Sequence, residues 1–350
     1  MTELDRLIRS MIEAEGPMPI ARFMQLALQH PEYGYYVKGD PLGVDGDFTT
    51  APEVSQLFGE TIGLWLADTW RRSCKPSPFA LLELGPGRGT LMRDALRVCD
   101  RVLGFPQAMK LHLMESNITL REKQAETLGA YNPVYLEDLS DLPEMPLFVI
   151  ANEFFDALPI YQYINTEAGW RERLIGLEGD KLVFVQSKKK VPMPLPEELP
   201  FFEMSMQAIA IVQLLSAHIA KHGGAFLIAD YGATQGGQGD TLQAVSGHAS
   251  VPVLEAAGQV DLTAHVDFAA LAQVARRQGA FVPDVTAQGP FLQALGIEIR
   301  AAQLKLKATP EQAKAIDEAV ARLLDPDQMG SLFKVMAIVP EGQNEVCGFT

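Results

Sequence analysis

The sequence is poor in cysteine and in basic residues. Its 350 residues include three cysteines, at positions 74, 99 and 347, and no two of them have the C-x-x-C spacing of metal and redox motifs. A disulfide framework is therefore not expected, and this cysteine usage suits a reducing compartment. Lysine and arginine total 29 against 44 acidic residues, a net charge of −15. Because this field repels phosphate backbones and anionic lipid surfaces, we expect neither a nucleic-acid nor a membrane partner.

The sequence also lacks a long apolar run and a recognisable targeting segment. The most apolar helix-like segment, residues 204–220, is interrupted by four polar side chains, which argues against a membrane span. The N-terminal residues MTELDRLIRS mix acidic and apolar side chains and resemble neither a signal peptide nor a transit peptide. We therefore predict a cytoplasmic protein. His218 and His222 have no Glu or Cys at ligand spacing, so no metal site is predicted.

A glycine-rich turn is the most informative stretch that is present. Residues 79–84 (FALLEL) have the pattern of a buried parallel strand, and a helix is expected over residues 90–98. Between them Gly85, Gly87 and Gly89 alternate with other residues. Glycine permits positive φ and lets a ligand lie against bare main chain, where it faces the free N–H groups of the helix start. The stretch predicts a site for a nucleotide-like ligand.

Two cofactor classes use such a turn, and the spacing favours one of them. The dinucleotide fingerprint G-x-G-x-x-G would need glycine where Thr90 stands. The acid two places before the first glycine, Glu83, instead produces the E-x-G-x-G-x-G pattern of S-adenosylmethionine (SAM) methyltransferases. A nicotinamide site and a glycine turn without ligand stay open as alternatives.

The rest of the chain alternates strand and helix patterns, which predicts a doubly wound α/β sheet. The expected strands of this sheet are residues 79–84, 110–115, 134–136, 147–151, 225–229, 281–287 and 332–339. Three further short strands within residues 161–186 predict an inserted β meander. Residues 201–221 are predicted to form one long helix, and a helix is expected to start at residue 261 with Thr263 as its cap.

Three parts of the chain follow from this pattern. Residues 1–75 are expected to form an N-terminal helical cap with lid loops. The cofactor-binding core comprises residues 76–158 and 201–350, and residues 159–200 form the inserted meander and a linker. The loops at 30–36 and 46–52, rich in Tyr, Gly and Thr, are interpreted as a lid or docking surface or, alternatively, as packed connectors.

Polar residues follow the expected strands at the edge of the sheet where ligands bind. Glu115 ends the second strand, where an acid can accept both ribose hydroxyls, although a helix-capping carboxylate would look the same. Asp138 follows the third strand and is a candidate for the adenine amino group. Asn152, Glu153 and Asp156 follow the fourth. If Glu153 begins a helical turn, Asp156 shares its face, and the two carboxylates could grip a cation; a helix cap with first-turn acids is the alternative.

Several longer motifs carry a family resemblance. The stretches ELGPGRG (83–89), NEFFDALP (152–159), GDFTTAPEV (46–54) and DLTAHVDF (261–268) resemble the MidA family of class I SAM-dependent methyltransferases, over residues 4–340. The resemblance implies a Rossmann-like core of seven strands, SAM as cofactor and a protein arginine as acceptor. Relatives in that family include a mitochondrial complex I assembly factor that methylates an arginine of a complex I subunit, so such a subunit is a possible partner.

The candidate site residues fall into three groups. Those expected to bind SAM are Glu83, Gly85, Pro86, Gly87, Gly89, Glu115, Ser116, Asp138, Leu139 and Asn152. Those expected to act in catalysis are Asn152, Glu153 and Asp156. Those expected to contact substrate or form a lid are Tyr33, Tyr36, Asp47, Phe48, Thr49, Thr50, Tyr231 and His265.

The functional hypothesis is transfer of a methyl group from SAM to an arginine side chain. Arginine is protonated at neutral pH, so its lone pair must be localised by neighbouring carboxylates, a task that suits Glu153 and Asp156. Two other hypotheses stay open. The protein could be an assembly chaperone that keeps SAM as a structural ligand, or a nicotinamide-dependent oxidoreductase. The sequence makes no prediction of oligomeric state.

Overall fold

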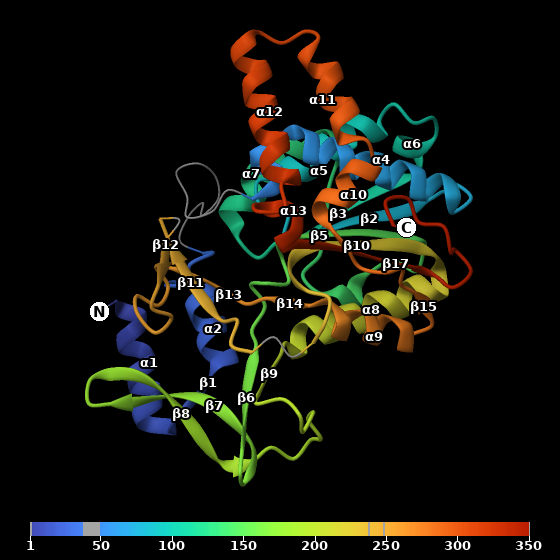
Figure 1. The fold of residues 1–350 in the computed structure, drawn as a ribbon. Helices are drawn as coiled ribbons and strands as arrows, with labels where there is room; N and C mark the ends of the chain where they lie inside the picture. The colour runs from blue at the N-terminus through green and yellow to red at the C-terminus, as the bar shows by residue number, and fades with distance from the viewer. Residues whose placement is uncertain (1, 38–49, 237–238, 248, 350) are drawn as a thin grey trace.

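The structure, a computed structural model, describes residues 2–37, 50–236, 239–247 and 249–349 (Figure 1). Within these ranges a central sheet contains seven strands along one continuous path and two short strands beside it. In spatial order the seven are β15 (Ala280–Phe281), β17 (Phe333–Pro340), β10 (Gly224–Ala233), β5 (Leu147–Asn152), β2 (Phe79–Leu84), β3 (Met109–Met114) and β4 (Val134–Tyr135). β17 runs antiparallel to both of its neighbours, and the strands from β10 to β4 are parallel. The predicted seven-stranded α/β sheet is confirmed.

Helices cover both faces of this sheet because its strands bury side chains on both sides. In β2, Leu81 packs into the cluster under α4 (Gln56–Arg72) and α5 (Thr90–Cys99). Its neighbour Leu82 faces the opposite cluster, which holds α8 (Met206–His222) and α9 (Phe268–Arg277). Successive residues of a strand point to opposite faces, so a strand buried on both sides is apolar throughout. This explains the unbroken run at 79–84.

A second lobe lies below the central sheet in Figure 1. The N-terminal helices α1 (Glu3–Glu15) and α2 (Ile20–Gln29) share an apolar cluster with the inserted strands. The five-stranded sheet of this lobe contains β1 (Met18–Pro19), β6 (Tyr161–Thr166), β7 (Gly169–Glu178), β8 (Lys181–Lys190) and β9 (Phe201–Met204). A separate three-stranded sheet contains β11 (Gln243–Ser246), β12 (Ala249–Val251) and β13 (Asp261–Thr263). The N-terminal 75 residues are thus shared between lobes, because α4 packs on the central sheet while α1 and α2 pack on the meander.

Two predicted helix starts are wrong. Residues 201–204 form β9, which pairs with β6, and α8 begins only at Met206, where the Ser205 side chain accepts a hydrogen bond from Ala208 N. Residues 261–263 form β13, and Asp267, not Thr263, caps α9 by accepting from Ala270 N at 2.9 Å. In both places strand pairing with a distant segment overrides the local helical pattern. The single strand expected at 281–287 is divided between β15 and β16 (Thr286–Ala287).

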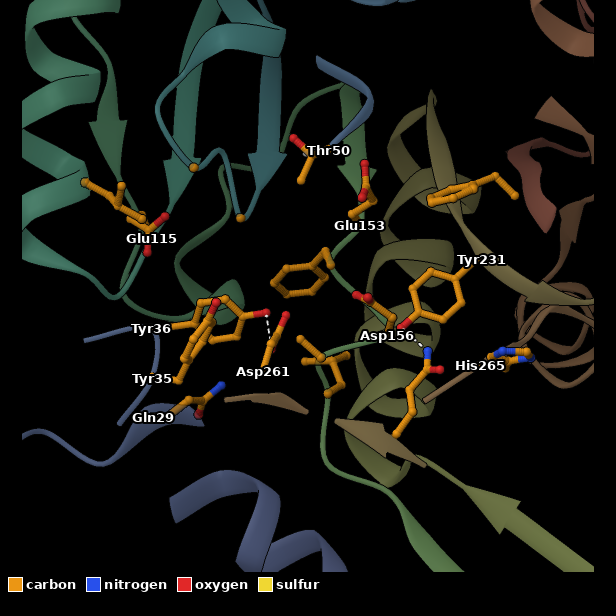
Figure 2. A pocket seen from close by; sticks show the side chains of 18 of the residues that line it. Gln29, Tyr35, Tyr36, Thr50, Glu115, Glu153, Asp156, Tyr231, Asp261 and His265 are labelled. Atoms are coloured by element: carbon orange, nitrogen blue, oxygen red, sulfur yellow. Dashed lines mark hydrogen bonds between the residues drawn. The ribbon is translucent and has the colours of Figure 1, made fainter. Parts of the chain in front are cut away.

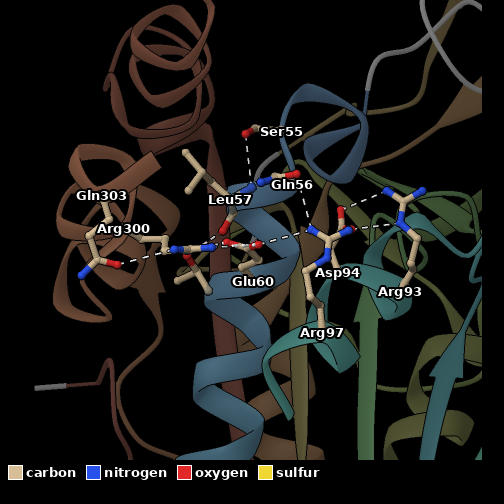
Figure 3. Close-up of polar contacts among 10 residues, drawn as sticks. Ser55, Gln56, Leu57, Glu60, Arg93, Asp94, Arg97, Arg300 and Gln303 are labelled. Atoms are coloured by element: carbon tan, nitrogen blue, oxygen red, sulfur yellow. Dashed lines mark hydrogen bonds and ion pairs between the residues drawn. The ribbon is translucent and has the colours of Figure 1, made fainter. Parts of the chain in front are cut away.

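Near the C-terminus, α11 (Ile297–Lys305) and α12 (Pro310–Leu324) form a hairpin that projects from the sheet (Figure 1). It follows α10 (Gln288–Ala294) and precedes α13 (Met329–Leu332). Its base is tied to α4 through Glu60, which is 2% exposed and binds both Arg97 of α5 and Arg300 of α11 (Figure 3). The remaining α-helices are α3 (Ala51–Val54) and α6 (Phe105–Ala108), each of one turn, and α7 (Ile118–Leu128), which has the usual length of three turns. Over the ranges that the structure describes, no helix is long and apolar enough to cross a membrane.

Candidate active site

A cavity of about 440 Å³ opens where β2, β3, β5 and β10 end, next to the second lobe (Figure 2). Its volume is within the range of small-molecule sites, and its position is the edge at which open α/β sheets bind ligands. Of the residues predicted from sequence, the cavity is lined by Tyr36, Thr50, Gly85, Gly87, Glu115, Ser116, Glu153, Asp156, Tyr231 and His265. The fold therefore brings together the glycine turn, the acid after β3 and the acids after β5.

The glycine turn after β2 needs glycine for its backbone. Gly85, Gly87 and Gly89 have φ of 62°, 55° and 78°, in the left-handed region that side chains disfavour. A Cβ on Gly85 would also lie 2.8 Å from the Phe154 ring. Gly89 is the N-cap of α5, so the turn leads directly into a helix start. Gly85 and Gly87 line the cavity, whereas Pro86 and Gly89 are in the turn without lining it.

Glu115 faces the cavity from the end of β3. Its Oε1 accepts from Asn117 N at 2.9 Å, and its Oε2 accepts from Gln124 Nε2 at 3.3 Å. Gln124 is fully buried on α7 and also donates to Gly87 O at 2.6 Å, so it connects the glycine turn to the acid. Burial raises the pKa of Glu115. Gln124 was not predicted from the sequence; the available signal is a lone polar residue on the buried face of an amphipathic helix.

The two acids after β5 lie together in the cavity wall. Glu153 has φ of 50°, which is unusual for a residue with a side chain. Its Oε1 accepts from Ala51 N at 2.8 Å and from Asn152 Nδ2 at 3.0 Å. Burial raises the pKa of Glu153 to about 7, and burial together with the negative charge of Glu153 raises the pKa of Asp156 to about 7. Perturbed carboxyl groups that share a cleft are typical of a functional site.

Residues of the second lobe and of the C-terminal hairpin complete the cavity. Tyr36, just after α2, donates from Oη to Asp261 Oδ1 at 2.9 Å, and both line the cavity. Gln243 donates to Tyr231 Oη at 3.2 Å, and Arg322 reaches the cavity from the end of α12. No role was predicted for Asp261, Gln243 or Arg322, because the contacts that bring them to the cavity join distant segments. Asp261 does begin the DLTAHVDF motif, which was the available signal.

Other predicted site residues lie away from the cavity. Glu83 is buried within β2, where burial and the charge of Glu115 raise its pKa to about 8. Asp138 is exposed and accepts from Ser140 N at 2.7 Å, so it caps a short turn. The others outside the lining are Leu139, which packs in the core, Asn152, beside Glu153, and Tyr33, stacked on His30. Asp47, Phe48 and Thr49 are outside the described residues.

The residues present fit SAM. Gly85 and Gly87 offer bare main chain, Glu115 offers a carboxylate in the cavity lining, and two buried acceptors, Asn152 Oδ1 and Asp156 Oδ1, have no protein partner in the described part of the chain. Buried acceptors of this kind need donors from water or from a ligand, and SAM carries such donors on its amino group and ribose hydroxyls. Across the same ranges there is no cluster of three His, Cys, Asp or Glu side chains able to hold a metal ion.

Fold and site together define a Rossmann-like enzyme that binds a cofactor containing a nucleoside. Residues 61–286 match the model of a family described as "Putative S-adenosyl-L-methionine-dependent methyltransferase". The chain is 38% identical to "Protein arginine methyltransferase NDUFAF7, mitochondrial" of Mus musculus and 36% identical to that of Danio rerio, covering 97% and 95% of this chain and 85% and 86% of the relatives. The chain belongs to this family of SAM-dependent methyltransferases, and SAM is its cofactor.

A solved structure agrees with this assignment. A likely methyl transferase of the COG1565 superfamily from Burkholderia thailandensis, bound to S-adenosyl-homocysteine (SAH), superposes with a TM-score of 0.82 at 28% identity, covering 99% of this chain and 93% of that one. A second structure of that superfamily from the same organism gives 0.80 at 27% identity. These comparisons confirm the class I methyltransferase fold predicted from the sequence.

The predicted cytoplasmic location is wrong by the same comparisons. The curated relatives from zebrafish, mouse and human all carry the word mitochondrial in their names. The prediction was made from the charge and hydropathy of the first ten residues, and these properties alone do not determine the compartment of a protein.

Proposed function

We propose that this enzyme methylates a guanidinium nitrogen of a protein arginine. The observation that carries the proposal is the pair of acids, half-buried Glu153 and buried Asp156, in the wall of the cavity that also contains the glycine turn. A guanidinium presents several donors in a rigid fork, and carboxylates are the partners that match it. The names of the relatives, protein arginine methyltransferase, support the same acceptor.

In this proposal one set of residues holds the cofactor and another set orients the acceptor. Gly85, Gly87, Glu115 and Ser116 would hold SAM, which supplies an electrophilic methyl group when bound. Glu153 and Asp156 orient the guanidinium so that one nitrogen points toward that methyl group. Asp156 Oδ1, which lacks a partner among the described residues, would accept the proton that this nitrogen loses when the sulfur–methyl bond breaks and SAH is left. Positioning of this kind can lower a barrier by roughly 7–11 kcal/mol.

We further propose that the acceptor is a subunit of respiratory complex I or a similar protein. The support is the family resemblance in the sequence motifs and the net charge of −15, which would steer a basic acceptor segment toward the enzyme.

The test uses SAM with a labelled methyl group and peptides that cover the arginines of complex I subunits, each paired with an Arg→Lys version. We expect label on arginine, located by mass spectrometry, and none on the lysine versions. In Glu153→Gln the amide oxygen can still accept from Ala51 N, so SAH affinity should persist while the transfer rate falls roughly 10²–10⁴-fold. Glu172→Gln, a half-buried glutamate of β7, is the matched control and should keep the wild-type rate.

Two outcomes would contradict the proposal. Tight SAH binding with no labelled arginine in any peptide or pulled-down partner would favour the assembly chaperone. A loss of SAH affinity in Glu153→Gln equal to its loss of rate would place Glu153 among the cofactor ligands.

A further inference from the structure

We propose that Asp230 is the positioning residue that holds the turn 153–156 in the shape needed to bind the acceptor. The inference rests on the proposed role of Glu153 and Asp156. Asp230 touches neither the cavity nor, in this proposal, the acceptor; it acts through the backbone of the turn.

One carboxylate of β10 accepts four backbone N–H groups. Asp230 Oδ2 accepts from the amides of Phe154, Phe155 and Asp156 at 3.1, 2.9 and 3.3 Å. Its Oδ1 accepts from Tyr231 N at 2.9 Å, and the residue is fully buried. Consecutive N–H groups that converge on one point form a concavity for an anion, and here the anion is a side chain of the neighbouring strand.

The turn needs this support because its first residue is strained. A residue with a side chain held at positive φ costs on the order of 1–3 kcal/mol, and Glu153 has φ of 50°. Its own N–H donates to Ala229 O at 2.9 Å, which fixes where the turn starts. With the next three amides anchored by Asp230, Glu153 is directed to Ala51 N and Asp156 to the cavity (Figure 2).

The charges around Asp230 make this arrangement specific to an acid. Glu153 and Asp156 face it from the β5 turn, Tyr231 is adjacent in β10, and Lys334 is its partner in β17. The Lys334 ammonium donates to Leu332 O at 3.2 Å and also to Ser331 O, so backbone carbonyls hold it. Burial and the charges of Asp156 and Glu153 raise the pKa of Asp230 well above its usual range, and hydrogen bonds from the amides of Phe155 and Asp156 oppose that rise. Ionisation of Asp230 and ionisation of Asp156 therefore oppose each other.

The test is Asp230→Asn, which keeps the shape of the side chain but removes its ionisable carboxyl group and places an amide donor among backbone donors. We expect SAH affinity to persist while the rate of methyl transfer falls by about 10²-fold, the typical cost of a misplaced reacting group. The ascending limb of the pH–rate profile should shift to lower pH, because Asp156 then ionises without a second acid that interacts with it. A crystal structure of the variant with SAH should show residues 153–156 rearranged.

Glu60→Gln is the control, since Glu60 is an equally buried acid that does not line the cavity. It should lower the midpoint of unfolding without moving the pH–rate profile. The proposal is overturned if Asp230→Asn keeps the wild-type turn and profile, or if its loss of rate merely follows loss of folded protein, as in Glu60→Gln. Should Asp230→Asn not fold, hydrogen exchange of the wild-type amides 154–156 decides: slow exchange supports the proposal and fast exchange overturns it. If the wild type methylates no arginine, the proposed function fails, yet the turn in the variant crystal still decides the role of Asp230.

Discussion

Gly85 occupies a position where the backbone conformation and the neighbouring side chain both favour glycine. Its φ is 62°, and an added Cβ would lie 2.8 Å from the Phe154 ring in the cavity wall. We predict that Gly85→Ala strongly weakens SAH binding and destabilises the fold by more than about 1 kcal/mol, since the backbone strain and the clash add. Calorimetric titration with SAH and urea unfolding measure the two effects.

The matched control is Gly179→Ala, in the turn between β7 and β8. Gly179 has φ of 57°, but nothing lies within 4 Å of an added Cβ. It should lose a similar amount of stability from the backbone alone while keeping the SAH affinity of the wild type. Unchanged SAH affinity in Gly85→Ala would show that the glycine turn is not the cofactor site.

The acids after β5 predict how activity depends on pH. Because burial raises the pKa of both Glu153 and Asp156 to about 7, they carry protons below that pH and negative charge above it. A cationic guanidinium binds the charged form. We predict that kcat/KM for an arginine peptide, at saturating SAM, rises as the pH passes through about 7. Since the two acids interact, the limb reports the pair and not one residue.

Asp156→Asn removes one of the two titrating groups and should flatten this limb. Glu172→Gln should leave it in place. A rate that falls as the pH rises through the same range would contradict the assignment, because it would mean that the protonated acids are the active form.

An ionic network around the buried Glu60 connects α4, α5 and α11 (Figure 3). Glu60 Oε2 lies 2.7 Å from Arg300 Nε, and Glu60 Oε1 lies 3.2 Å from Arg97 Nη1. Arg97 also binds Asp94 at 2.8 Å. The two arginines are partly exposed, but Glu60 is buried and depends on them. A buried charge that loses all partners is far costlier than one that keeps a partner.

We predict that the losses of unfolding free energy on replacing Arg97 and Arg300 are not additive. Arg300→Met alone should cost about 1–2 kcal/mol, because Arg97 still neutralises Glu60. Arg97→Met with Arg300→Met should cost about 3–5 kcal/mol, more than the sum of the single variants. Adding Glu60→Leu should restore part of the loss. Urea unfolding of the four variants measures this, and additive losses would show that the network contributes little.

How far the sequence predicts the elements depends on where their partners lie. The strand 79–84, the glycine turn and the helix that begins at residue 90 follow from local pattern, and the structure has them as predicted. The strand at 201–204 and the start of α9 depend on pairing with β6 and β11, which no local pattern records. The site residues divide in the same way. Glu115 was predicted at the cavity from the local pattern and lies there. Gln124 and Asp230 could be recognised only from the packing of α7 and β10 against the glycine turn and the turn 153–156.

The cavity is assembled from segments that are far apart in the chain. Tyr36 follows helix α2 of the second lobe, Gly85 and Glu115 come from the central sheet, Asp261 from the small three-stranded sheet and Arg322 from the C-terminal hairpin. A ligand that fills this cavity contacts all four of these parts. Its binding energy therefore stabilises the arrangement of the lobes as well as the cofactor turn.

We predict that SAH protects segments of both lobes from hydrogen exchange. At a concentration of 100 Kd a ligand adds about 2.7 kcal/mol to the stability of the state that binds it. Exchange should slow at residues 29–36 and 261–265 as well as at 85–89, because opening any of these segments would break the cavity. Gly85→Ala, at the same SAH concentration, should show none of the three effects. Protection confined to residues 85–89 would mean that the second lobe closes on the cavity independently of the cofactor, so that its loops respond to the acceptor instead.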